Sequence, residues 1–174
     1  MTDKEFLRAV TNGETDLLQV LLDVLEETGA GHCVIGGLAV NAYVEPVVSL
    51  DLDLVVATDG LDAVAIAAAA RGLKVEPFPH RVNLSGPGSD LRIQLQTDPR
   101  YQDFISRAES RTVLGYPLKV ASVEDVLQGK LWAYQDESRR SSKRQKDLAD
   151  VARLVEARPE LEARLPAAVR DRLA

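Results

Sequence analysis

Residues 34–40, VIGGLAV, and residues 49–56, SLDLDLVV, decide the fold of this chain. The first stretch is an apolar strand that ends in a double glycine and continues as a short helical segment. The second is a strand that carries two carboxylates two residues apart. Successive side chains of a strand point to opposite faces, so Asp51 and Asp53 share one face. Two carboxylates on one face beside a glycine turn suit a divalent cation and a phosphate.

The composition is that of an ordinary globular protein. The chain has 174 residues, of which 45 % are hydrophobic and 28 % are charged, enough for one domain with a sizeable core. With a net charge of −6, the surface as a whole does not attract polyanions. Binding of a nucleic acid would therefore need a local basic patch. The single cysteine, Cys33, excludes a disulfide framework. No basic n-region with an apolar h-region opens the sequence and no apolar run reaches the length of a membrane span, so we expect a cytoplasmic protein without a membrane partner.

Hydrophobic periodicity and turn residues predict an α/β (α+β) fold. Helices are expected at residues 3–10, 14–28, 38–43, 61–72, 101–108, 123–136 and 144–157, and strands at 33–35, 50–57, 73–76, 81–84, 91–96 and, as a hairpin, 112–120. We expect a small mixed β-sheet with N-terminal and flanking helices over residues 1–120. A helical extension over residues 121–174 is expected to pack on this core.

The two aspartates and the two glycines are each open to a structural explanation. Carboxylates at positions i and i+2 of a strand can grip one hard cation, or bridge two that lie about 4 Å apart. They could also form a solvated strand edge, although Asp is uncommon in strands and like charges on one face repel. A double glycine lets backbone N–H groups approach an anion, but it also serves as a tight turn. The combination of all four residues favours a binding site.

The spacing of these motifs resembles the signature of the nucleotidyltransferase superfamily, which has the DNA polymerase β-like fold. Gly36-Gly37 is followed, after thirteen residues, by Asp51-Leu52-Asp53. The flanking residues make the chain similar to the bacterial nucleotidyltransferase-like proteins related to the AbiEii toxins. Further similarity lies in residues 120–125, VASVED, in Lys130 and in residues 146–150, KDLAD, so the resemblance covers roughly residues 30–156.

This resemblance implies a function and a set of site residues. The protein would transfer a nucleoside monophosphate from an NTP to a hydroxyl group of RNA or protein, with release of pyrophosphate. Asp51 and Asp53 would be catalytic and would bind Mg²⁺. The nucleotide-binding residues would be Gly36, Gly37, Ser49, Lys130 and Lys146. A second protein, as one half of a toxin–antitoxin pair, is a further expected partner.

The chain departs from the superfamily at the third carboxylate, which a later strand would supply. The best-placed strand reads RIQLQ over residues 92–96, with Gln94 where an acidic residue is expected. A neutral amide cannot deprotonate a hydroxyl or match the hold of a carboxylate on Mg²⁺. Asp90 and Asp98 flank this strand, and either could substitute through a shift in register. Whether the protein is an enzyme is therefore left open by the sequence.

Two other classes of function remain open. A catalytically degenerate member of the fold could act as an interaction module, for example in a toxin–antitoxin pair, and Gln94 favours this. An RNA-binding accessory protein could use residues 139–146, RRSSKRQK, which bring five basic residues together in an acidic chain. Such a charge run also forms ordinary solvated surface.

Overall fold

The structure is a computed structural model that describes residues 2–13 and 15–174. Its strands are β1 (His32–Ile35), β2 (Asp51–Val56), β3 (Lys74–Phe78), β4 (Arg81–Ser85), β5 (Arg92–Gln96), β6 (Glu109–Val113) and β7 (Tyr116–Val120). Its α-helices are α1 (Asp3–Val10), α2 (Leu17–Thr28), α3 (Gly36–Val40), α4 (Leu61–Ala70), α5 (Val123–Gln135), α6 (Ser141–Ala157) and α7 (Ala167–Leu173). Short 3₁₀ segments are η1 (Thr58–Gly60), η2 (Pro99–Arg107) and η3 (Pro159–Arg164).

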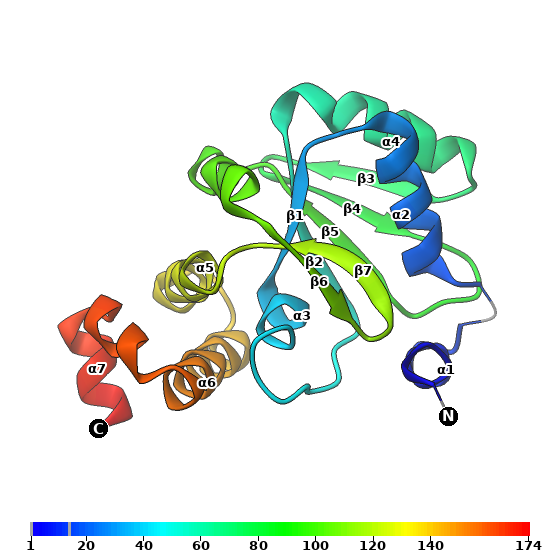
Figure 1. Ribbon diagram of the computed structural model, residues 1–174. Coiled ribbons are helices and arrows are strands. Elements are labelled where there is room, and N and C mark those ends of the chain that lie inside the picture. Colours follow the sequence, from blue (N-terminus) through cyan, green and yellow to red (C-terminus); the bar gives the residue numbers. More distant parts are fainter. Residues whose placement is uncertain (1, 14) are drawn as a thin grey trace.

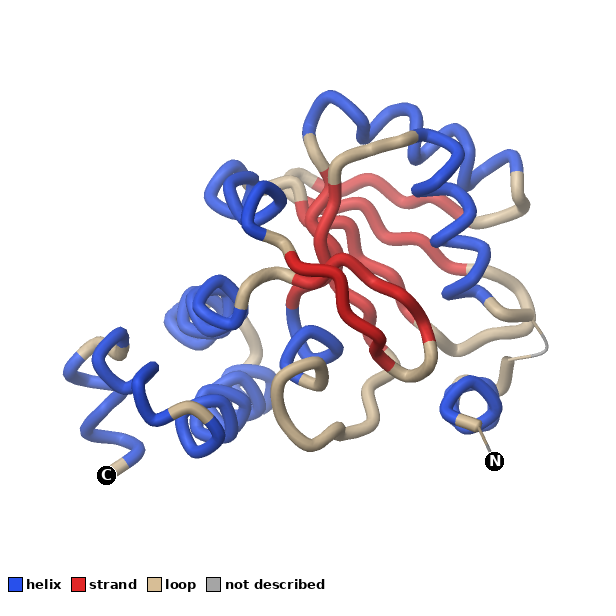
Figure 2. Tube along the Cα trace, in the orientation of Figure 1, coloured by secondary structure: helices blue, strands red, loops and turns tan. Residues whose placement is uncertain are grey.

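In the described residues the seven strands form one mixed sheet in the order β3-β4-β5-β2-β1-β7-β6 (Figure 1). Strands β2 and β5 are parallel, as are β1 and β7, and the other neighbours are antiparallel. Helices α2 and α4 lie together on one side of the sheet, and α3, α5 and α6 gather on the other, with α7 beyond them (Figures 1 and 2). Strand β2 is therefore central and carries its acidic residues in the middle of the molecule.

Local sequence explains where the elements begin and end. Helix α2 starts where the Asp16 side chain accepts a hydrogen bond from Gln19 N (3.1 Å), and it ends at Gly29, whose φ is +63°. Helix α5 starts where Ser122 Oγ accepts a hydrogen bond from Asp125 N (3.2 Å). This hydrogen bond is one half of a capping box.

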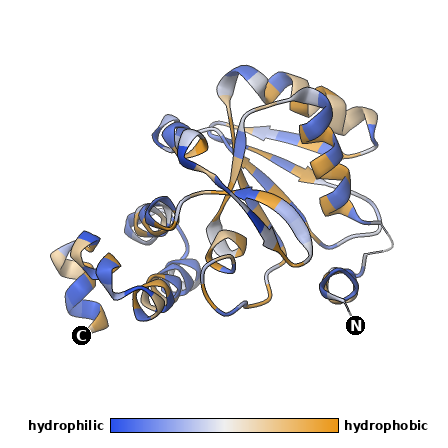
Figure 3. Ribbon diagram, in the orientation of Figure 1, coloured by the Kyte–Doolittle hydropathy of each residue, from blue (hydrophilic) through white to orange (hydrophobic). Residues whose placement is uncertain are grey.

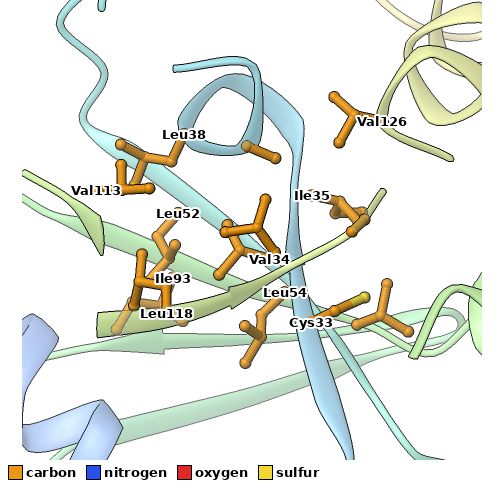
Figure 4. Packing of buried hydrophobic residues seen from close by; sticks show 14 of the residues in the cluster. Cys33, Val34, Ile35, Leu38, Leu52, Leu54, Ile93, Val113, Leu118 and Val126 are labelled. Atoms are coloured by element: carbon orange, nitrogen blue, oxygen red, sulfur yellow. The ribbon is translucent and has the colours of Figure 1, made fainter. Parts of the chain in front are cut away.

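The hydrophobic core runs along the central strands. Cys33, Val34 and Ile35 of β1 are buried and meet Leu52 and Leu54 of β2 (Figure 4). Hydrophilic and apolar colours alternate along the strands and most of the helices, and α4 is largely apolar in colour (Figure 3). Burying these apolar side chains is the main favourable term in folding and holds β1 and β2 in register.

The predicted α/β class is confirmed, with some shifts of element boundaries. The helix expected from residue 14 begins at Leu17, and residue 14 itself lies outside the described residues. The helix expected at 38–43 is α3, which starts two residues earlier, on the glycines themselves. The division at residue 120 stays a prediction. No helix in the described part of the chain is long and apolar enough to cross a membrane.

Candidate active site

The bend between β1 and α3 lies against strand β2. Pairing sets Ile35 opposite Asp53, so the next residue, Gly36, packs on the Asp53 side chain. Gly36 has a φ of +71°, a conformation that glycine adopts without strain. A Cβ atom at this position would collide with Asp53 Oδ2 and would lie 3.1 Å from Asp53 Cβ. Both the backbone and the adjacent carboxylate therefore require glycine here.

A cleft of about 620 Å³ opens over this bend, large enough for a nucleotide. Gly36 and Asp53 line one end of it, and Gln94 and Gln96 of β5 continue its sheet-side wall. The rest of the lining comes from the β3–β4 hairpin, from η2, from α5 and from the segment that leads into α6. These residues include Phe78, His80, Arg81, Asp98, Arg100, Tyr101, Lys130, Trp132, Asp136, Arg139 and Asp147.

Asp53 is the least satisfied carboxylate of this cleft. Burial raises its pKa to about 6, against the opposing charges of Lys130 and Arg139 and with further help from Asp51 and Asp147. No hydrogen bond or ion pair within residues 2–13 and 15–174 involves its oxygens. An ionised Asp53 therefore lacks a direct counter-charge, which is the condition in which a cation is bound most readily.

Asp51 differs from Asp53 because it is already paired. Its Oδ1 lies 2.7 Å from Arg92 Nε on the adjacent strand β5, and its Oδ2 lies 3.4 Å from Lys143 Nζ on α6. Asp51 and Asp53 share one face of β2, as their spacing predicts, and they are close enough for Asp51 to raise the pKa of Asp53. Asp51 lies next to the cleft rather than in its lining.

Lys130 is buried between α5 and α6. Its Nζ lies 3.1 Å from Asp147 Oδ1 and 2.8 Å from Asp150 Oδ2. Burial alone would lower the pKa of Lys130, but the Asp150 and Asp147 carboxylates together raise it. Arg139 Nε binds the other oxygen of Asp147 at 2.7 Å. The network ties the two helices together and keeps a charged ammonium group beside the cleft.

The position of the third carboxylate is occupied by Gln94. The parallel pairing of β2 with β5 sets Gln94 directly beside Asp53. Asp90 is engaged elsewhere, because its Oδ2 accepts a hydrogen bond from Asn12 Nδ2 (2.7 Å). Asp98 does line the cleft, but its Oδ2 lies 3.1 Å from Arg100 Nη2. Neither flanking aspartate takes the place beside Asp53.

The donor set at this site suits a hard cation such as Mg²⁺ only in part. Asp53 offers an unpaired carboxylate, and Asp51 offers a second one that Arg92 and Lys143 now hold. No group of three or more His, Cys, Asp or Glu side chains with metal-binding geometry occurs in the described residues. Because Mg²⁺ keeps several waters and is often held by one or two carboxylates plus substrate phosphates, two protein carboxylates still fit it.

The remaining predicted residues lie at different distances from this cleft. Gly37 packs beside Ser49, whose Oγ would lie 3.7 Å from a Cβ atom at Gly37. Ser49 Oγ accepts a hydrogen bond from Asp51 N (3.2 Å), so it braces the start of β2. Lys146 is exposed on α6 and is not part of the cleft lining. The roles predicted for these three residues stay predictions.

Two groups of cleft residues were not predicted from the sequence. Trp132 stacks on Phe104 with ring centroids 5.7 Å apart, and it also lines the cleft. The hairpin residues Phe78 and Arg81 line the cleft at its other side. No short motif connects these residues, because they reach the cleft from elements far apart in the chain.

Comparison with known proteins identifies one matching family. The family described as "Nucleotidyl transferase AbiEii toxin, Type IV TA system" matches residues 33–174, which begin at the second residue of β1 and include the glycine bend and all later elements. No curated protein matches the chain.

Several solved structures share the fold. ANT(2″)-Ia in complex with adenylyl-2″-tobramycin is 18 % identical, with a TM-score of 0.60 over 91 % of this chain and 97 % of that chain. The lincomycin-bound lincosamide antibiotic adenylyltransferase LnuA is 14 % identical, with a TM-score of 0.56 over 80 % and 98 %. An antigenic nucleotidyltransferase-like protein from Paracoccidioides brasiliensis is 18 % identical, with a TM-score of 0.54 over 93 % of each chain. At these identities the likeness is one of fold.

Proposed function

Because the chain belongs to the family of AbiEii nucleotidyltransferase toxins of type IV toxin–antitoxin systems, we propose that it is an active nucleotidyltransferase. It would transfer a nucleoside monophosphate from an NTP to a hydroxyl group of RNA or protein. The acceptor oxygen forms a bond to the α-phosphorus and gives up its proton to water, the bond from the α-phosphorus to the oxygen that bridges it to the β-phosphorus breaks, and pyrophosphate leaves with that oxygen. A cytoplasmic location and a partner protein from the same toxin–antitoxin system belong to this proposal.

One observation carries the proposal: Gly36 packs directly on the Asp53 carboxylate at one end of a nucleotide-sized cleft. Gly36 lines the cleft, so its backbone is available to a phosphate group beside an unpaired carboxylate. A cation between the phosphate group and the Asp53 carboxylate would join the negatively charged ligand to the negatively charged side chain. Gly37 and Ser49 would support the same bend from the side of β2.

Asp51 and Asp53 would hold Mg²⁺ together with the phosphates of the NTP. When bound, this ion would polarise the phosphoryl group and offset the charge that develops in the reaction. Asp53, with a pKa of about 6, is ionised at neutral pH and available for this. Lys130 would lower the cost of bringing a triphosphate close, although its ammonium group already pairs with Asp147 and Asp150. Lys146 would act only at longer range from its exposed position.

The proposal is tested by labelling with α-³²P NTPs in the presence of Mg²⁺. We expect label to appear on an RNA or protein acceptor and to disappear in Asp53→Ala. Asp59→Ala, which changes an exposed aspartate of η1 outside the cleft, is the matched control and should label normally. Equal labelling by Asp53→Ala and the parent protein would refute the proposal.

The second candidate function is a catalytically degenerate interaction module, and Gln94 is the observation that favours it. Gln94 lies beside Asp53 and cannot take a proton from an acceptor hydroxyl. A degenerate protein would bind NTP, as measured by equilibrium dialysis, without labelling any acceptor. Gln94→Glu would add the missing carboxylate, and label that appears only in this variant would support the degenerate class.

A further inference from the structure

The cations around the cleft differ in whether a carboxylate already neutralises them. Four Lys and Arg side chains line it: Arg81, Arg100, Lys130 and Arg139. Lys130 lies between Asp147 and Asp150, and Arg139 also binds Asp147. Arg100 holds the Asp98 carboxylate through two nitrogens, Nε at 3.2 Å and Nη2 at 3.1 Å from Oδ2. Three of the four are thus committed to internal partners.

Arg81 is the exception. In residues 2–13 and 15–174 its guanidinium group has neither a hydrogen-bond acceptor nor a carboxylate partner. It lies instead over the ring of Phe78, 4.7 Å from the centroid, and Phe78 itself is 44 % exposed. The stack holds the guanidinium in place from one side and leaves its five N–H donors free. An oriented, uncommitted cation in a cleft is a site for an anion.

The sheet sets the backbone separation between Arg81 and the strand that carries Asp53. Arg81 pairs with Gln96 on β5, and β5 in turn pairs with β2, so two strand spacings, about 10 Å, separate Arg81 laterally from β2. Gly36 and Arg81 therefore stand at opposite sides of one cleft. A ligand with phosphates can reach both sides, with one phosphate at the glycine bend and another at the hairpin.

We propose that Arg81, held by Phe78, binds a phosphate group of the ligand that occupies this cleft. The inference rests on the proposed function, because it assumes a nucleotide or nucleic-acid ligand. The phosphate belongs either to the NTP or to the backbone of an RNA acceptor, since both present the same oxygens to a guanidinium fork. In either case Arg81, rather than Lys130 or Lys146, is the side chain that contacts phosphate directly.

The test measures binding of three probes to the full chain: inorganic tripolyphosphate, each of the four NTPs, and a short single-stranded RNA. Arg81→Gln should weaken the binding of at least one probe by about tenfold or more, the size expected for one charge-assisted contact. Arg81→Lys keeps the charge without the fork and should lose less. Arg172→Gln removes the same charge from α7, outside the cleft, and should bind as the parent does. Circular dichroism checks that each variant is folded.

The pattern of loss identifies the phosphate. Weaker binding of tripolyphosphate and NTPs assigns Arg81 to the donor nucleotide. Weaker binding of RNA alone, with a salt dependence reduced by about one counterion, assigns it to the acceptor backbone. Unchanged binding of all three probes by Arg81→Gln would overturn the inference, as would a parent protein that binds none of them. A parent protein that binds these probes but transfers no label would contradict only the proposed function.

Discussion

Gly36 and Asp53 are the pair of residues on which the candidate site depends. Gly36→Ala should destabilise the protein for two separable reasons: its φ of +71° and the collision of a new Cβ atom with Asp53 Oδ2. The positive φ alone costs about 1–2 kcal/mol. Gly72→Ala is the matched control, because Gly72 has a φ of +85° but nothing within 4 Å of its Cβ position. Urea denaturation should therefore show a larger loss for Gly36→Ala than for Gly72→Ala.

A double-mutant cycle isolates the collision from the backbone strain. In an Asp53→Ala background the carboxylate is gone and only the 3.1 Å contact with the Cβ of residue 53 stays, so most of the excess cost of Gly36→Ala over Gly72→Ala should disappear. Equal losses for the two glycine variants in the parent background would mean that Gly36 and Asp53 do not pack as described. The cycle needs no ligand, so it tests the geometry without reference to the function.

The pKa of Asp53 predicts an unusual pH dependence of stability. In the unfolded chain an Asp titrates near about pH 4, whereas in the folded protein the pKa of Asp53 is about 6. Between these values the folded protein holds a proton that the unfolded chain has lost, so this group's contribution falls as the pH rises through about 6. Asp53→Asn should therefore be more stable than the parent at neutral pH, by up to about 3 kcal/mol.

Thermal and urea denaturation of both proteins across the acidic to neutral range measure this difference. It should vanish below about pH 4, where the carboxylate is protonated in both states. A divalent cation that binds the ionised carboxylate should also reduce this stability difference at neutral pH, because the cation stabilises the folded state of the parent protein. A variant less stable than the parent at neutral pH would show that Asp53 has a compensating partner.

At the scale of elements, α5 and α6 are joined by buried charges rather than by apolar contacts alone. Lys130 is 7 % exposed, and Asp147 and Asp150 are buried around it. Lys130→Met would leave these carboxylates without their shared ammonium partner, at a cost of about 3–5 kcal/mol. Arg71→Met, which breaks the exposed pair with Glu27, should cost only about 0–1 kcal/mol in the same urea titration.

Removing the charge of one carboxylate tests why Lys130→Met loses stability. Lys130→Met combined with Asp150→Asn should recover part of the stability, because one fewer unpaired charge is then buried. If the double variant is no more stable than Lys130→Met, lost packing rather than unpaired charge would account for the effect.

The elements also show which parts of the site the sequence could predict. Asp51 and Asp53 share a face because a strand alternates with a period of two, and this needs no knowledge of the rest of the fold. The placement of Gln94 beside Asp53 depends on the pairing of β2 with β5, which lie about forty residues apart. Arg81 and Trp132 come from still other elements, so only tertiary structure brings them to the cleft.

The basic segment at residues 139–146 is a case in which the sequence pattern misleads. Its charges predict a surface patch, but Arg139 and Lys143 turn inward to Asp147 and Asp51. Counting charges along a sequence cannot show which of them are neutralised by residues far away in the chain. The patch that remains for a nucleic acid is correspondingly weaker than the composition suggests.

At the scale of the whole molecule, an acidic chain surrounds a cleft whose charges nearly balance. The net charge is −6, and the four Lys and Arg side chains of the cleft face four aspartates: Asp53, Asp98, Asp136 and Asp147. Long-range attraction therefore contributes little to the capture of a polyanionic ligand. A bound cation, which belongs to the proposed function, and the uncommitted Arg81, which belongs to the further inference, would have to supply local attraction.

The helical segment after residue 120 should unfold together with the sheet. Its links to the core include Tyr43 Oη, which donates to Ala121 O (2.7 Å), Arg107 Nε, which binds Asp125 Oδ2 (2.8 Å), and Lys143 Nζ, which lies 3.4 Å from Asp51 Oδ2. Trp132, the single tryptophan, packs on Tyr101 and Phe104 of η2, so its fluorescence reports on this junction. Fluorescence and far-UV circular dichroism should follow one transition in urea, as a two-state domain does. A tryptophan transition at lower urea than the circular dichroism would instead make residues 121–174 a separate unit, and the cleft would then lose one wall before the sheet unfolds.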